Sequence, residues 1–148
     1  MTVDLVVEHV RHPDSETLDS LSALLSQLSR SAKQLTLQSL TAIVSSDTTT
    51  LMVARLGDRM VGTLTLVVFP LPTGVRAWIE DVVVDESARG AGVGAALVDA
   101  AIDWAREAGA RTVDLTSRPT REAANRLYER LGFQRRSTNV YRIELTDG

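Results

Sequence analysis

Hydrophobic positions recur with two different spacings along the chain, and each change of spacing marks a new element. In the first half, leucines at helical spacing follow an acidic start that contains a proline, which predicts an amphipathic helix. Two aliphatic runs separated by a Gly-Asp pair indicate a hairpin. The elements predicted are a strand over 3–9, a helix that starts at 13–16 and carries Leu18, Leu21, Leu25 and Leu28, a short helix over 37–44, and strands over 51–56 and 60–69 joined by Gly57-Asp58.

The second half alternates strands and helices. The order predicted is a strand over 78–84, a helix over 93–104 stopped by Gly109, a strand over 112–116, a helix over 124–131 and a last strand over 140–145. Helices interleaved with strands in this way indicate an α/β (α+β) fold built on a mixed sheet. The 148 residues suit one domain, so we expect a single unit over 1–148.

Composition and charge narrow the classes of function. The net charge of −3 disfavours a nucleic-acid-binding protein, which needs a basic surface. The chain has no cysteine, which excludes a cysteine nucleophile and cysteine metal ligands. Its two histidines, His9 and His12, stand in polar company, where solvation or capping is the expected role, so we expect no metal site. No apolar run is long enough to cross a bilayer and no secretory signal is seen, so we expect a cytoplasmic protein.

The most informative segment is the glycine-rich stretch between the strand over 78–84 and the next helix. It reads Arg89-Gly90-Ala91-Gly92-Val93-Gly94, and its glycines let the main chain approach a ligand closely. Backbone N–H groups at a helix start have no partner within the helix and converge on an anion, while Arg89 adds a fixed positive charge. The segment therefore predicts a diphosphate-binding loop. A glycine-rich turn that only closes the connection is the structural alternative.

Two other kinds of phosphate-binding loop fit this segment less well. A P-loop ends in Gly-Lys-Ser/Thr, and this chain has neither lysine nor hydroxyl at that place. The stretch from Gly90 to Ala95 matches the Gly-x-Gly-x-x-Ala pattern of dinucleotide-binding proteins. Asp114 lies about 20 residues later, where those proteins carry the carboxylate that binds the ribose. However, five polar residues, 85–89, separate the strand from the first glycine, whereas the dinucleotide turn is tight.

A second motif lies downstream, where Ala124, Tyr128 and Gly132-Phe133 are regularly spaced along the predicted helix. Together with Arg89-x-x-Gly92-x-Gly94, this Ala-x-x-x-Tyr-x-x-x-Gly-Phe pattern resembles the signatures of the GNAT family of N-acetyltransferases, over residues 50–145. The resemblance implies the acyl-CoA N-acyltransferase fold, with a mixed, mostly antiparallel sheet that is splayed in the middle and flanked by about four helices. It also implies transfer of an acetyl group from acetyl-CoA to a primary amine by direct attack in a ternary complex.

The resemblance places the coenzyme along the strand over 78–84 and the loop after it. In the family, the backbone of this strand follows a bulge and binds the pantetheine arm, and one amide polarises the thioester carbonyl. The loop would hold the pyrophosphate, and Ser117 would face the pantetheine from the next strand. The cofactor-binding residues expected are Val82, Val83, Val84, Arg89, Gly90, Ala91, Gly92, Val93, Gly94, Ser117, Arg121 and Asn125.

Two catalytic roles follow from the same resemblance. Tyr128 matches the family's general acid, which protonates the coenzyme A thiolate as it leaves. Glu80 and Asp81 precede the valines, and strand alternation sends them to opposite faces unless a bulge intervenes. Either could relay a proton from the amine or bind a cationic substrate, and an exposed acidic pair is the alternative. The run from Ile79 to Val84 resembles that of glucosamine-6-phosphate N-acetyltransferases.

The sequence departs from the family pattern at Arg121, where many members carry asparagine; the nearby asparagine here is Asn125. Three roles stay open for Arg118 and Arg121. They could hold a coenzyme phosphate, they could bind an anionic group of the substrate, or they could simply be solvent-exposed residues at the start of a helix. In the family the last strands line the acceptor side or a dimer interface. Asn139 and Tyr141 are therefore candidate substrate contacts, and the chain is a candidate homodimer.

The resemblance leaves the amine acceptor open, and either a small molecule or a peptide fits. A function of another class, a non-catalytic acyl-CoA-binding sensor or interaction module, would share the coenzyme site but would not need Tyr128 or Glu80. The dinucleotide-binding alternative predicts that NAD(H) binds and acetyl-CoA does not. We expect no nucleic-acid or membrane partner.

Overall fold

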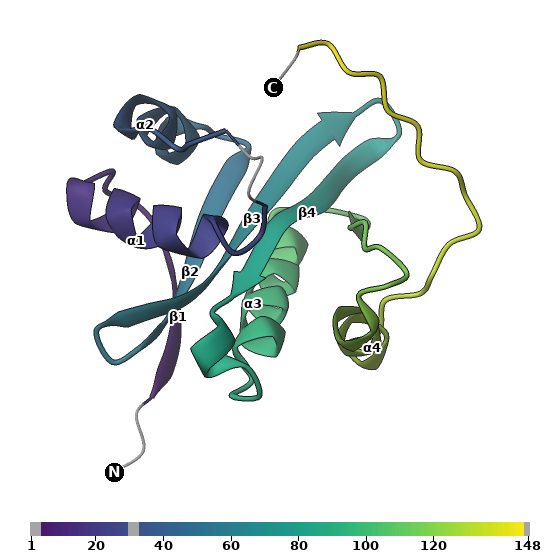
Figure 1. Cartoon of the computed structure of the whole chain (residues 1–148). Coiled ribbons are helices and arrows are strands. Elements are labelled where there is room, and N and C mark those ends of the chain that lie inside the picture. The colour runs from purple at the N-terminus through teal and green to yellow at the C-terminus, as the bar shows by residue number, and fades with distance from the viewer. Residues whose placement is uncertain (1–3, 30–32, 147–148) are drawn as a thin grey trace.

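A five-stranded sheet with helices on both faces forms the body of the molecule (Figure 1). The computed structural model describes residues 4–29 and 33–146. Its elements in chain order are β1 (Leu5–His9), α1 (Ser15–Leu25), α2 (Leu37–Ser45), β2 (Thr49–Leu56), β3 (Arg59–Leu71), β4 (Gly74–Val84), the short 3-10 helix η1 (Glu86–Ala88), α3 (Val93–Glu107), β5 (Val113–Asp114) and α4 (Glu122–Arg130). The expected fold class, a mixed and mostly antiparallel sheet flanked by helices, is confirmed.

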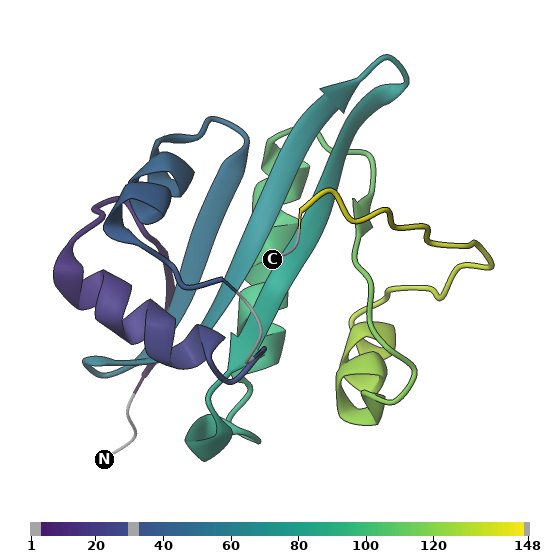
Figure 2. The same cartoon turned by 45° about the horizontal axis from the view of Figure 1, so that its top comes forward.

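The strands follow one another across the sheet in chain order, from β1 to β5. The first four pair antiparallel, and β5 alone runs parallel to its neighbour β4. Helices α1 and α2 cover one face, whereas α3 covers the other (Figures 1 and 2). The chain passes from the end of β4 through η1 into α3, and it reaches α4 only after β5.

Each face of the sheet buries its own core, because strand alternation sends successive side chains to opposite sides. The core under α3 includes Leu64, Leu66, Ile79, Leu97, Val98 and Ala101. The core under α1 and α2 includes Leu21, Leu24, Leu40, Val53, Met60 and Val83. The sheet is therefore held from both sides, and β4 contributes side chains to both cores.

Capping hydrogen bonds explain where the first two helices begin. The Asp14 carboxylate accepts a hydrogen bond from the Thr17 amide at 2.8 Å. Thr36 and Ser39 form a capping box, in which each side chain binds the other residue's backbone amide. Such caps satisfy N–H groups that the helix cannot satisfy itself, typically stabilising it by about 1 kcal/mol. The predicted helix start at 13–16 and the helix over 37–44 are thus confirmed.

Other boundaries differ from the sequence prediction. The hairpin is longer than predicted, because β3 continues through Leu71 before it turns at Pro72-Thr73. The predicted strand over 112–116 shortens to Val113–Asp114, and Leu28 lies beyond the end of α1. In the strand predicted over 3–9, residue 3 lies outside the described residues.

The predicted last strand over 140–145 is wrong. No described residue from 134 to 146 belongs to a helix or strand. No backbone hydrogen bond joins this segment to another described residue. The alternation of apolar and polar residues there satisfied the strand pattern, but a strand also needs a neighbouring edge to pair with, which the pattern does not supply.

Candidate active site

A β-bulge interrupts β4 beside its apolar end. Thr65 pairs with Glu80 and Thr63 pairs with Val83, so the single residue Leu64 lies opposite two residues, Asp81 and Val82. Asp81 has a φ of 50°, which is uncommon for a residue with a side chain. One extra residue on one strand with such a dihedral bends that strand and shifts its alternation.

The bulge changes which side chains of β4 share a face. Val82 packs with the core under α3 and Val83 with the core under α1 and α2, whereas Glu80 and Asp81 are both exposed. The Glu80 carboxylate accepts a hydrogen bond from the indole nitrogen of Trp78 at 2.6 Å. The alternation that would have separated the two acids is therefore broken, and Trp78 orients one of them.

Beyond the bulge β4 has no partner on its outer edge. Pairing with β5 is seen only at Ala77 with Val113 and at Trp78 with Asp114. After Asp114 the chain moves away from β4 and then turns into α4 (Figure 2). Along this edge of residues 79–84, no described strand takes up the outward N–H and C=O groups, which leaves them to a ligand or to water.

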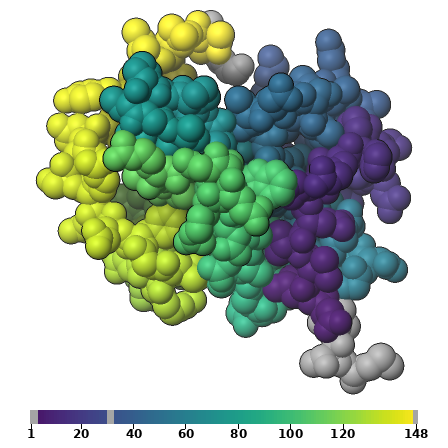
Figure 3. Space-filling view, turned by 180° about the vertical axis from the view of Figure 1, so that it is seen from behind, coloured from purple at the N-terminus to yellow at the C-terminus, as the bar shows by residue number. Residues whose placement is uncertain are grey.

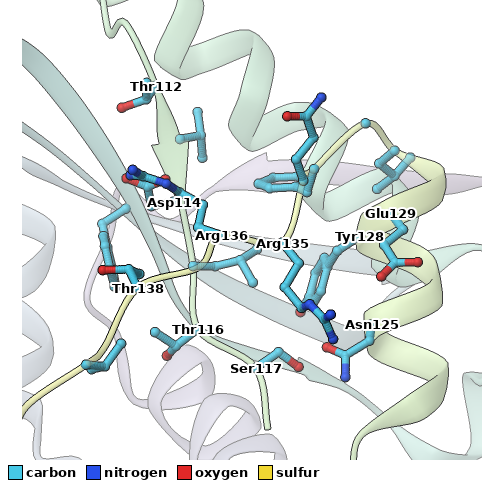
Figure 4. A pocket seen from close by; sticks show the side chains of 18 of the residues that line it. Thr112, Asp114, Thr116, Ser117, Asn125, Tyr128, Glu129, Arg135, Arg136 and Thr138 are labelled. Carbon is cyan, nitrogen blue, oxygen red and sulfur yellow. The ribbon is translucent and has the colours of Figure 1, made fainter. Parts of the chain in front are cut away.

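A cavity of about 1080 Å³ lies between β5, α4 and the segment that follows α4. Seen from behind, the molecule is hollowed between the green residues around α3 and β5 and the yellow C-terminal residues (Figure 3). Three of the predicted site residues, Ser117, Asn125 and Tyr128, line this cavity together (Figure 4). Ser117 and Tyr128, which are 11 positions apart in the chain, thus share one wall of the cavity.

Ser117 carries a buried hydroxyl without a partner. Its Oγ is the one buried side-chain nitrogen or oxygen, within the described ranges, that makes no hydrogen bond. An unsatisfied buried hydroxyl typically costs about 1–3 kcal/mol. Such a group in a cavity wall is suited to a ligand that completes its hydrogen bond.

Tyr128 is buried in the wall of the same cavity. Its side chain is 7% exposed, and its ring lies edge-on to that of Phe133 with centroids 5.9 Å apart. Burial raises the pKa of Tyr128 above its ordinary value, and the positive charge of Arg121 opposes this shift. The phenol is therefore protonated at neutral pH and can act as a proton donor.

The glycine loop ends in an uncapped helix start. Gly90 and Gly92 have φ values of 86° and 79°, a region that glycine enters at little cost. Gly92 is the N-cap of α3 and no side chain caps the helix. Because Ala96 is the first amide to bond back to Gly92, the amides of residues 93–95 have no partner within the helix. A Cβ placed on Gly90 or Gly92 would meet nothing within 4 Å, so the loop faces open space.

Close packing holds this helix start against β3 and α4. A Cβ on Gly62 would lie 2.7 Å from Val93 Cγ1, and one on Gly94 would lie 3.1 Å from Leu127 Cδ2. Both glycines are therefore needed for close approach rather than for a special dihedral. Through Leu127 the first turn of α3 touches the helix that carries Tyr128.

The turn before α4 carries Arg121, the residue at which the sequence departs from the family pattern. Arg121 occupies the N-cap position and makes no capping hydrogen bond, and its side chain is exposed. Asn125 donates a hydrogen bond from Nδ2 to the Arg118 carbonyl at 3.0 Å. Asn125 thus fixes the turn that carries both arginines while lining the cavity with its own side chain.

Asp85 joins the loop to the other face of the sheet, a role that sequence reasoning missed. Gln27, just after α1, donates to the Asp85 carboxylate at 2.9 Å and accepts from the Glu86 amide at 3.2 Å. Arg59 bonds both Asp85, at 2.6 Å, and Ser87. Hydrogen bonds from Ser87 and Gln27, followed by the Arg59 contacts, lower the pKa of Asp85 to about 2. Because Gln27 lies 58 residues before Asp85 in the chain, no local sequence pattern predicts this contact.

Asn139 and Tyr141 lie apart from these groups. Both are exposed, and neither lines the cavity, although Thr138 and Val140 do. The contact they make is with each other, from Asn139 Nδ2 to the Tyr141 hydroxyl at 3.4 Å. Their predicted role as substrate contacts thus finds no supporting geometry within the described chain.

Two kinds of feature are absent from the described residues. Outside the masked positions, no three His, Cys, Asp or Glu side chains are grouped closely enough to hold a metal ion. None of the helices described above is long and apolar enough to cross a membrane.

Comparison with known proteins places this chain in a family. Residues 18–133 match the model of the acetyltransferase (GNAT) family. The uncharacterized N-acetyltransferase YhdJ of Bacillus subtilis (strain 168) is 43% identical over 61 residues, which are 40% of this chain and 43% of that protein. The chain thus matches less than half of that relative's length.

Solved structures agree with this family. A putative acetyltransferase from Agrobacterium tumefaciens str. C58 is 28% identical with a TM-score of 0.84, and the match covers 94% of this chain and 99% of that one. Glucosamine-6-phosphate N-acetyltransferase from Arabidopsis thaliana shares the fold, with a TM-score of 0.78 at 21% identity over 95% of this chain and 98% of that one. The chain belongs to the GNAT family of acetyltransferases.

Proposed function

We propose that this enzyme moves an acetyl group from acetyl-CoA to a primary amine by direct attack in a ternary complex. The observation that carries the proposal is the opened edge of β4 after the bulge, next to a cavity that holds the unpartnered Ser117 hydroxyl and the buried Tyr128. Acetyl-CoA supplies the acetyl group already activated as a thioester. The acceptor is a small molecule or a peptide that presents an amine.

The residues present fit the coenzyme. Its pantetheine arm is a chain of amides, which suits the free backbone edge of Val82–Val84 on one side and the Ser117 hydroxyl on the other. The uncapped amides of residues 93–95, with Arg89, fit its pyrophosphate. One amide of the β4 edge would donate to the thioester oxygen as negative charge develops there.

Tyr128 holds the proton that the leaving sulfur needs. A phenol of ordinary pKa, about 10, is already neutral at neutral pH, and burial raises the pKa of Tyr128 further, so Oη carries a proton. A thiol has an ordinary pKa of about 8.5, below that of a phenol, so the phenol is the weaker acid. It assists by hydrogen bonding to the sulfur as negative charge develops there, which requires it to lie within hydrogen-bond reach. The position of Tyr128 in the cavity wall supports this role.

Glu80 and Asp81 serve the acceptor amine. An alkyl amine is protonated at neutral pH and must lose a proton before it attacks. Both carboxylates are exposed at the bulge, and the indole of Trp78 holds Glu80 in place. Glu80 is the better-oriented base, acting through water, whereas Asp81 is suited to attracting a cationic acceptor.

Thiol release from acetyl-CoA with pooled amines tests the mechanism. We expect amine-dependent release by the unmodified chain and a loss of about 10²-fold or more in kcat for Tyr128→Phe. Phenylalanine keeps the ring contact with Phe133, so acetyl-CoA affinity and melting temperature should stay unchanged. A variant that keeps its full kcat would show that another group supplies the proton. Coenzyme binding without release in any pool would contradict the transfer itself.

A further inference from the structure

Three side chains of β4 form a row on the face of the sheet that carries α1 and α2. Ala77 and Ile79 belong to the core under α3, so strand alternation sends Arg76, Trp78 and Glu80 to the opposite face. The hydrogen bond of 2.6 Å from the Trp78 indole to the Glu80 carboxylate agrees with this placement. Arg76 and Trp78 are half-buried and Glu80 is exposed. The row therefore runs from a carboxylate at the bulge, past an indole, to a guanidinium group.

The helices leave this row uncovered. Helices α1 and α2 lie to one side of the first half of β4, and the β3–β4 hairpin extends past them at its turn (Figures 1 and 2). On the neighbouring strand, Thr65, Val67 and Phe69 face the same way and are half-buried. Trp78 also lines the cavity that holds Tyr128. A molecule bound over the row would thus have one end beside the proposed site of acetyl transfer.

A second arginine joins the row at the turn of the hairpin. Arg111, just before β5, donates a hydrogen bond from Nη1 to the Thr73 carbonyl at 2.9 Å, and Arg76 donates from Nη2 to the Thr73 hydroxyl at 3.2 Å. A Cβ built on Gly74 would lie 3.0 Å from Arg76 Nη1 and 3.6 Å from Arg111 Nη1. The two guanidinium groups therefore border the same point, which glycine leaves free of a side chain.

No carboxylate neutralises these two arginines. Among residues 4–29 and 33–146, no ion pair includes Arg76 or Arg111, and Asp114, opposite Trp78 on β5, pairs with neither. Their hydrogen bonds to oxygens of residues 73 and 75 leave further N–H donors on each group. Two neighbouring guanidinium groups repel each other, and a carboxylate or phosphate between them offsets that repulsion while accepting hydrogen bonds from both.

We propose that the acceptor is a primary amine that carries a carboxylate or phosphate at its far end, with the amine at Glu80 and the anionic group between Arg76 and Arg111. This inference rests on the proposed function and names the class of its acceptor. A strand rise of about 3.3 Å per residue puts roughly 13 Å between the backbone positions of Arg76 and Glu80. A free amino acid is too short for that span, whereas an extended peptide with an acidic fourth residue reaches it. Trp78 offers its flat apolar ring to the middle of the acceptor.

A matched pair of peptides tests the charge preference. Thiol release is measured with Gly-Gly-Gly-Asp amide and with Gly-Gly-Gly-Asn amide as acceptors. We expect kcat/KM to be about tenfold higher for the acidic peptide, mostly through a lower KM, because charge-assisted hydrogen bonds hold its far end. Arg76→Gln and Arg111→Gln should each reduce that preference, and Arg111→Lys should keep it. Arg11→Gln, on an exposed arginine elsewhere, should leave it intact.

Two results would count against the site. Arginines that only hold the hairpin turn would, when replaced, slow both peptides equally. Equal kcat/KM for the two peptides in the unmodified chain would overturn the proposal. A series of ω-amino acids of increasing length, each compared with its amide, distinguishes the sources of such an acceptor. A preference for the long acids assigns a small molecule, and a preference confined to the peptides assigns a peptide.

Binding can be followed without turnover, which separates this inference from the transfer itself. The chain has two tryptophans, so Trp104→Phe leaves Trp78 as the only indole. We expect the acidic peptide to change the fluorescence of this variant at lower concentration than the neutral peptide, and Arg76→Gln to abolish the difference. That result without thiol release would contradict the proposed transfer and keep the acceptor site. Thiol release with equal binding of both peptides would overturn the acceptor site alone.

Discussion

Ser117 and Tyr128 lie in one cavity wall, yet burial affects them differently. Burial of Tyr128 raises the pKa of its phenol and keeps a proton available. Burial of Ser117 leaves its hydroxyl without a hydrogen bond. Under the proposed function, Tyr128 is ready to donate its proton in the free protein, whereas Ser117 gains a hydrogen-bond partner when the coenzyme binds.

Replacing Ser117 should therefore have opposite effects on stability and on binding. We expect Ser117→Ala to stabilise the free protein by up to about 1 kcal/mol, because an unsatisfied polar group is removed. We expect the same change to weaken acetyl-CoA binding about tenfold. Differential scanning calorimetry and isothermal titration calorimetry measure the two effects.

Thr63 provides the matched control. Its buried hydroxyl donates to the Met52 carbonyl at 2.9 Å, so Thr63→Val should destabilise the protein by about 1 kcal/mol. If Ser117→Ala also destabilised the free protein, its hydroxyl would have a partner in solution, and the argument for a waiting ligand site would fail.

Among the elements, the turn from β4 into α3 depends on side chains from two earlier parts of the chain. Asp85 receives Gln27 from the end of α1 and Arg59 from the start of β3. The helices that cover one face of the sheet are in this way tied to the proposed pyrophosphate loop. We expect movement of α1 to be transmitted to that loop.

The low pKa of Asp85 makes this tie dependent on pH. A folded-state pKa of about 2, below the ordinary 3.8, means that ionised Asp85 stabilises the fold above about pH 4. That contribution is lost as the pH falls from 4 toward 2. We expect Asp85→Asn to melt at a lower temperature at pH 6 and to show a flatter dependence of melting temperature on pH between 4 and 2.

Gln27→Ala should lower the same melting temperature at pH 6, whereas Gln34→Ala should not. Gln34 is exposed and makes no hydrogen bond within the described ranges. Parallel pH profiles for the unmodified chain and Asp85→Asn would show that the carboxylate contributes nothing to the fold.

Features that depend on local conformation could be predicted from the sequence, whereas contacts between residues far apart in the chain could not. The glycine loop and the helix with Tyr128 were predictable, because their residues need only local conformations: positive φ at Gly90 and Gly92, and helical spacing before Gly132. The Asp85 contacts were not, since Gln27 and Arg59 lie far away in the chain. Residues 140–145 were mispredicted as a strand because their pattern specifies a pleated face but not a partner strand.

For the whole molecule, positive charge is concentrated where the coenzyme is proposed to bind. The chain carries −3 overall, yet residues 118–136 contain six arginines against two glutamates. Arginine binds phosphate through a planar fork of donors, and all but one of the 16 basic residues are arginine. An anionic coenzyme is therefore attracted to one region of an acidic protein.

This distribution makes coenzyme affinity dependent on salt. We expect acetyl-CoA affinity to fall as NaCl rises from 50 to 500 mM, with Debye screening lengths shortening from ~14 to ~4 Å. We expect Arg121→Gln to flatten that dependence if the side chain holds a phosphate. Titration with coenzyme A and its 3′-dephospho form assigns the phosphate.

Equal loss of affinity for both forms in Arg121→Gln would point to the pyrophosphate, and loss for coenzyme A alone to the 3′-phosphate. An unchanged affinity for both would exclude a coenzyme role and leave the arginine to the acceptor. Arg106→Gln, on an exposed arginine paired with Asp103, is the control.

The opening beside β4 depends on a single residue. Taking Asp81 out of the chain would bring Glu80 next to Val82, and Leu64 would then face one residue instead of two, with every other pairing in the β3–β4 hairpin unchanged. The shortened β4 would be a regular strand, able to continue alongside the chain after Asp114. A closed sheet and a sheet with a free edge beside β4 thus differ by one codon, so losing that codon would be expected to remove the proposed coenzyme groove without rebuilding the core.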